Sequence, residues 1–93
     1  MKSLAILRFK DIDKSSLSVT KGNKWRTPTL DHFDGCAWTI QCEFLEDLTP
    51  ENTVQAEIQC FDAGEPFIHI VGNKFQLFGA FRFTCECEVI KIL

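Results

Sequence analysis

The feature of the sequence that most constrains its fold is a strict two-residue alternation between residues 81 and 89, near the C-terminus. Apolar or sulfur-bearing residues fill the odd positions, namely Phe81, Phe83, Cys85, Cys87 and Val89. Polar residues fill the even positions, namely Arg82, Thr84, Glu86 and Glu88. A period of two is typical of a β-strand with one face buried and the other in water. A single strand cannot bury its own face, so the rest of the chain must supply neighbouring strands.

The alternation changes parity just after Val89. Ile90 and Ile92 now carry the bulk, and Lys91 falls between them. This change predicts a β-bulge, or a strand end that is covered on both faces.

Similar patterns run through the rest of the chain. Residues 4–9, 36–44 and 54–60 have the composition or alternation of strands, and shorter apolar runs occur at residues 17–19, 67–71 and 75–78. Glycine, proline, asparagine, aspartate and serine separate these segments, as they do in tight turns. No segment repeats its apolar residues with a period of 3.6, so no helix is predicted.

Six or seven such strands predict an all-β protein, a single small antiparallel closed β-barrel spanning residues 1–93. Closure is the economical solution because it removes exposed sheet edges. The chain of 93 residues is too short for two independent cores. An exposed edge at residues 4–9 would be a place where two copies could pair.

Composition indicates the cellular compartment in which the protein functions. No apolar run approaches the roughly 18–20 residues that span a bilayer, and Arg8 and Lys10 interrupt the apolar N-terminal patch too early for a signal peptide. The five cysteines fall mostly on core-facing positions, where cysteine in a reducing compartment acts as a small hydrophobe. We therefore expect a cytoplasmic protein.

Charge is divided unevenly along the chain. Residues 1–30 carry seven lysines and arginines against two aspartates, whereas residues 31–93 carry three against eleven acidic residues. This asymmetry predicts a basic face and an acidic face, unless folding interleaves the two.

The motifs around the turns resemble those of the third domain of elongation factor Tu, a β-barrel. Gly72, Lys74, Phe75, Arg82, Val89 and Lys91 match the spacing of that domain's final hairpin and closing strand. Residues 22–28 (GNKWRTP) are similar to its glycine-basic-Thr-Pro hairpin, residues 38–44 resemble its aromatic-rich strand, and residues 49–52 fall where the family has a Pro-Gly-Asp turn. The resemblance covers nearly the whole chain and implies a stand-alone barrel of this type.

The chain also departs from that family. Ala80 and Phe81 at the last turn, and Cys85 and Cys87 in the last strand, stand where the family has glycines, so packing there must differ. No P-loop pattern is present, so the chain is not expected to be a GTPase. In the factor this domain contacts tRNA and partner proteins, but a fold alone does not carry a function.

Catalytic and metal-binding patterns are weak. His32 lies in a polar turn and is expected to be solvent-exposed, and His69 is expected to be an outward-facing strand residue. Cys85 and Cys87 lack the usual spacing of zinc ligands and would need Cys42, Cys60 or His69 beside them. We therefore predict no enzyme, no metal and no cofactor.

Two surfaces are candidates for binding, and neither involves DNA or a membrane. The first is acidic and would engage a protein partner, as an inhibitor or immunity-type protein does, by substituting carboxylates for phosphates; its residues are Glu43, Glu46, Asp47 and Glu51. The alternative is a basic hairpin with a stacking residue that would bind a tRNA-like RNA; its residues are Lys21, Lys24, Trp25 and Arg26. A non-catalytic module that binds a protein first and RNA second is the function that the sequence favours.

Overall fold

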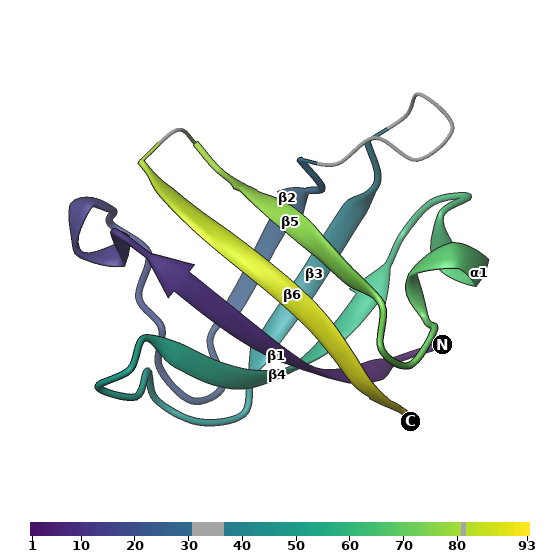
Figure 1. Ribbon diagram of the computed structural model, residues 1–93, viewed down its shortest axis with the longest axis horizontal. Helices are drawn as coiled ribbons and strands as arrows, with labels where there is room; N and C mark the ends of the chain where they lie inside the picture. The colour runs from purple at the N-terminus through teal and green to yellow at the C-terminus, as the bar shows by residue number, and fades with distance from the viewer. Residues whose placement is uncertain (31–36, 81) are drawn as a thin grey trace.

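The computed structural model describes residues 1–30, 37–80 and 82–93, and these residues form a single curled antiparallel sheet (Figure 1). Its order is β2-β3-β4-β1-β6-β5. The strands of the described residues are β1 (Ser3–Lys10), β2 (Lys24–Pro28), β3 (Thr39–Phe44), β4 (Thr53–Cys60), β5 (Lys74–Gly79) and β6 (Phe83–Ile92). The predicted all-β class is confirmed.

The sheet curls into a half-barrel and does not close. Its two edge strands, β2 and β5, meet at one end, where Thr29 bridges Leu77. There the Leu30 amide donates to the Gln76 carbonyl oxygen at 2.7 Å. The Thr27 hydroxyl donates to the Phe78 carbonyl oxygen at 2.6 Å. No ladder joins the two strands elsewhere in the described chain, so the prediction of a closed barrel is wrong.

Local sequence limits how β2 and β5 can pair. Pro28 lies on edge strand β2 and has no N–H to donate to a neighbouring strand. On the other side, β5 ends at Gly79 and the chain turns back at once into β6. Among the described residues, the remaining part of β2, around Trp25, therefore has no strand beside it except β3.

β1 is the central strand and not an edge. It pairs with β6 over its full length and with β4 from Ser3 to Arg8. The expectation that residues 4–9 form an exposed edge for pairing two copies is therefore wrong. The predicted bulge is confirmed, because the β1–β6 register jumps from Ala5 opposite Val89 to Leu4 opposite Lys91, which leaves Ile90 as the extra residue.

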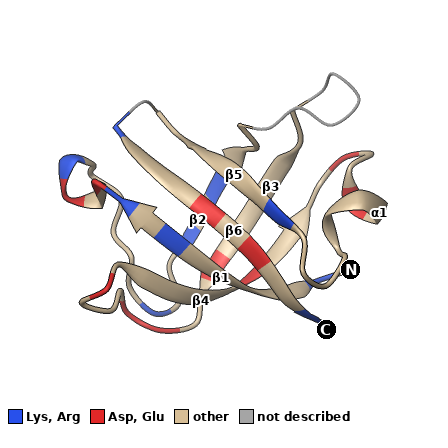
Figure 2. Ribbon diagram, in the orientation of Figure 1, with Lys and Arg blue, Asp and Glu red and all other residues tan. Residues whose placement is uncertain are grey.

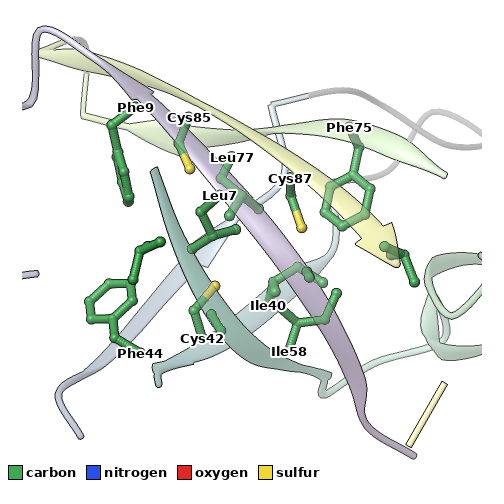
Figure 3. Packing of buried hydrophobic residues seen from close by; sticks show 14 of the residues in the cluster. Leu7, Phe9, Ile40, Cys42, Phe44, Ile58, Phe75, Leu77, Cys85 and Cys87 are labelled. Carbon is green, nitrogen blue, oxygen red and sulfur yellow. The ribbon is translucent and has the colours of Figure 1, made fainter. Parts of the chain in front are cut away.

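The concave face of the sheet forms the core (Figure 3). Alternate residues of every strand point inward, and Leu7, Ile40, Cys42, Cys85 and Cys87 are fully buried. Burying one such leucine or isoleucine side chain stabilises a fold by about 1.5–3 kcal/mol. Because the inward residues come from all six strands of the described sheet, its curvature and its core depend on each other.

Three segments depart from the sequence-based prediction. The run at residues 17–19 is not a strand, although Val19 is buried. A 3-10 turn, η1 (Ile12–Lys14), follows β1, and a short helix, α1 (Glu65–Ile68), stands where an extended run was expected at residues 67–71. Pro66 explains the helix, since its fixed φ suits the first turn.

The turn between β5 and β6 allows a test of backbone conformation. Ala80 has φ 54°, a left-handed conformation that costs a non-glycine residue about 1–2 kcal/mol. At the preceding position, a Cβ added to Gly79 would collide with the carbonyl oxygen of Phe83. We expect Ala80→Gly to raise the free energy of unfolding by about 0.5–1 kcal/mol, after the added entropy of the unfolded chain is subtracted.

The reverse change, Gly79→Ala, serves as the matched control and should lower the free energy of unfolding by more than 1 kcal/mol, roughly the cost of overpacking. Urea denaturation of both variants measures the two effects. If Ala80→Gly lowered the free energy of unfolding and Gly79→Ala raised it, the turn would have a conformation different from the one described.

Candidate functional site

The charges of the two halves of the chain are interleaved on the folded surface (Figure 2). Arg8 donates to Glu88 at 2.8 Å and to Glu86 at 3.2 Å. Lys24 lies 3.8 Å from Glu43, and the N-terminal ammonium lies 2.8 Å from Glu65. Each of these pairs joins a cation from the first thirty residues to a carboxylate from the rest. The predicted separation into a basic face and an acidic face is therefore largely lost.

The residues predicted to bind RNA do not form one surface. Lys24 and Arg26 point outward from β2, whereas Trp25 points to the inner side and packs on Phe9 and Phe83, with ring centroids 5.9 and 5.6 Å apart. Arg26 donates to Gln41 at 3.0 Å and its guanidinium lies over the ring of Phe61. Lys21 is exposed in the preceding turn. The one aromatic residue of the set is thus on the opposite face from its cations.

The residues predicted to bind a protein lie together on the β3–β4 hairpin. The segment from 43 to 57 carries five carboxylates and no lysine or arginine: Glu43, Glu46, Asp47, Glu51 and Glu57. Glu43 on β3 and Glu57 on β4 stand directly opposite each other in the ladder. We call this segment the acidic hairpin.

Hydrogen bonds to the backbone hold part of the acidic hairpin in place. Glu46 accepts from the Gln55 amide at 3.0 Å, and Asp47 accepts from the Lys21 amide at 2.9 Å. The loop is tied further by the Thr49 hydroxyl, which bonds to the Thr53 hydroxyl at 2.8 Å. Glu51 is exposed and forms no ion pair with a described residue.

A second feature, a hollow of about 730 Å³, lies at the open end of the half-barrel. Its described walls are residues 15–18, two residues of the β2 region and the tip of the β5–β6 hairpin: Ser15, Ser16, Leu17, Ser18, Asn23, Trp25, Phe78, Gly79, Ala80, Arg82 and Phe83. Sequence reasoning missed this site because it assumed a closed barrel. No local sequence pattern signals the hollow, because it depends on how the two edge strands meet.

The histidines give no catalytic arrangement in the described chain. His69 is buried, which corrects the expectation that it faces outward. Its Nδ1 lies 2.5 Å from the hydroxyl of Ser3, which is itself fully buried and out of reach of a substrate. Its Nε2 is buried and has no hydrogen-bond partner among the described residues. His32 lies outside the described residues.

The core cysteines lie near one another but in a dry environment. Figure 3 shows the sulfurs of Cys42, Cys85 and Cys87 within the apolar core. Burial raises the pKa of the Cys42 thiol to about 12 and raises that of Cys87 as well, so neither is the thiolate that a metal requires. In the described part of the chain, no three histidine, cysteine, aspartate or glutamate side chains form a group that could hold a metal ion.

No protein-family model, curated protein or solved structure matches this chain. The relationship to the third domain of elongation factor Tu therefore stays a prediction. None of the helices in the described residues is long and apolar enough to cross a membrane.

His69 should make stability depend on pH. Burial is the main cause that lowers the pKa of His69 below its ordinary 6.5, and the nearby N-terminal ammonium lowers it further. The unfolded chain therefore binds a proton at a higher pH than the folded chain does. As pH falls below 6.5 towards the folded pKa, the free energy of unfolding should decrease, with a slope of at most about 1.4 kcal/mol per pH unit for one proton.

The variant His69→Asn keeps a polar atom near Ser3 but cannot titrate, so it should flatten this part of the curve. Urea denaturation at several pH values measures the slope, and His32→Asn controls for the other histidine. An unchanged slope in His69→Asn would assign the titration to other groups.

Thiol reactivity should follow burial. We expect Cys42, Cys85 and Cys87 in the folded protein to react with iodoacetamide at least about 100-fold more slowly than in the denatured chain, because reaction needs local opening and a thiolate. Mass spectrometry of digested protein gives the rate for each cysteine. Fast labelling of any of the three in native protein would contradict the packing described above.

Proposed function

We propose that this protein is a non-catalytic binding module whose acidic hairpin engages a basic segment of a protein partner, as an inhibitor or immunity-type protein would. The observation that carries the proposal is the concentration of five carboxylates, without a lysine or arginine, on one hairpin. Complementary charge of this kind accelerates association and selects the partner.

The ladder geometry supports a cationic partner. Like charges directly opposite each other in an antiparallel pair are destabilising, and Glu43 and Glu57 are so placed. Among the described residues Lys24 forms an ion pair with Glu43 at 3.8 Å and Glu57 forms none, although Lys2 lines the same surface depression as Glu57. A lysine or arginine from a partner that inserts beside Glu57 would relieve the remaining repulsion.

The loop of the hairpin is also preorganised. Glu46 and Asp47 accept backbone hydrogen bonds, so their carboxylates are already ordered before a partner arrives. Ordering groups in advance lowers the entropy lost on binding. This preorganisation favours a protein partner. RNA is disfavoured, because Glu43 partly neutralises the charge of Lys24 and because Trp25 points to the inner side of the sheet.

The same proposal includes the relationship to the third domain of elongation factor Tu and a cytoplasmic location. Six antiparallel strands in the described sheet, with a hairpin of positive-φ Ala80 where the family has glycine, support a stand-alone relative of the third domain of elongation factor Tu. Four free, buried cysteines among the described residues support a reducing compartment such as the cytoplasm.

Affinity capture from the native host's lysate, with and without nuclease, tests the function. We expect the wild-type protein to retain a basic protein in the presence of nuclease, and Glu51→Lys to lose it by about tenfold or more, because a charge at the interface is reversed. Asp13→Lys, which makes the same change in net charge on exposed η1, is the matched control and should retain the partner.

The RNA alternative gives a different result in the same experiment. Nuclease would then release the captured material, and Arg26→Glu would abolish capture whereas Glu51→Lys would not. Either that pattern, or capture that is unchanged in Glu51→Lys, would overturn the proposal.

A further inference from the structure

The hollow at the open end of the half-barrel is separate from the acidic hairpin. None of its described lining residues belongs to the segment from 43 to 57. Its volume of about 730 Å³ falls in the range of roughly 300–1,000 Å³ that small-molecule sites occupy. The hollow exists because β2 extends past the point where it meets β5, so the inner face of β2 stays reachable there.

Aromatic rings form the rigid wall of the hollow. Trp25 and Phe83 are both half-buried, with ring centroids 5.6 Å apart. Each also packs on Phe9, which is buried in the core, at 5.9 and 5.7 Å. The core thus fixes the orientation of both rings, while part of each ring is accessible to a ligand. Ligand sites commonly combine such fixed aromatic surfaces with a few polar groups.

The polar rim of the hollow carries positive charge. Arg82 is exposed at the rim, and no carboxylate belongs to the described lining. Arg8 and Arg26 both have partners on the outer face of the sheet, whereas no described carboxylate forms an ion pair with Arg82. The hydroxyls of Ser15, Ser16 and Ser18 add further hydrogen-bonding groups. Asp11 lines a neighbouring hollow that also includes Arg82, but among the described residues its ion pair is with Lys14, so the guanidinium of Arg82 stays available to an anion.

We propose that the hollow binds a small aromatic anion. Its ring system would lie against Trp25 and Phe83, and its carboxylate, sulfonate or phosphate group would pair with the guanidinium of Arg82. The planar guanidinium donates two parallel hydrogen bonds to such groups, which gives orientation as well as affinity.

The fluorescent sulfonate 8-anilinonaphthalene-1-sulfonate is a suitable probe, and N-phenyl-1-naphthylamine is the same ring system without the charge. We expect one saturable site for the sulfonate on the native protein. Arg82→Gln should weaken its binding about tenfold, the usual effect of losing a charge-assisted hydrogen bond. Arg26→Gln, on the outer face, should leave it unchanged, and the uncharged probe should not respond to Arg82→Gln.

Nuclear magnetic resonance of the two indole N–H groups places the bound probe. The Trp25 signal should shift with saturation, whereas the Trp38 signal should not, because Trp38 is buried and stacked on Phe67, 5.5 Å away, with no place in this hollow. Ser16→Phe should block the site by filling it, without removing any core side chain. Shifts at Trp38 alone, equal sulfonate affinity in wild type and Arg82→Gln, or binding that does not saturate would each overturn the proposal.

Discussion

A single sheet with one apolar face has no second layer to cover it in the described part of this protein. That face can leave water only if the sheet curls upon itself, because the stable architectures all bury apolar faces against another surface. Leu7 at the centre therefore packs with residues from strands on both sides of it. Three features contribute to this curvature: the bulge at Ile90, the short edge strands and the bridge between Thr29 and Leu77.

Incomplete curling explains why one end of the molecule is open. The edge strands meet between Thr27 and Leu30, where Leu30 donates to Gln76, and they separate on the N-terminal side of Thr27. The hollow beside Trp25 is thus a product of the same backbone constraint that prevents closure. An aromatic residue that a closed barrel would have buried is left half-exposed there, next to an arginine whose guanidinium forms no ion pair with a described residue.

Strands whose apolar residues alternate could be predicted from the sequence, and so could the bulge after Val89. In these strands the alternation shows which side chains are buried, because one side of a pleated strand faces the core and the other faces water. The helix at Glu65–Ile68 could not be predicted, since four residues give no helical period. Closure and the hollow depend on how two edges meet, which no local pattern encodes. The acidic residues lie together because they share one hairpin, whereas Trp25 lies on the opposite side of its strand from Lys24 and Arg26.

The position of β1 has a consequence for how the chain reaches its native state. The first strand in the sequence lies in the middle of the sheet, and Arg8 pairs with residues about eighty positions away. Contacts of such long sequence separation slow folding, because the entropy of closing the loop is lost before the contact forms. During synthesis, residues 3–10 leave the ribosome long before residues 83–92, and they gain their second neighbour only when residues 83–92 follow. Until then the nascent chain carries an apolar strand with one side unpaired, the kind of surface that chaperones bind.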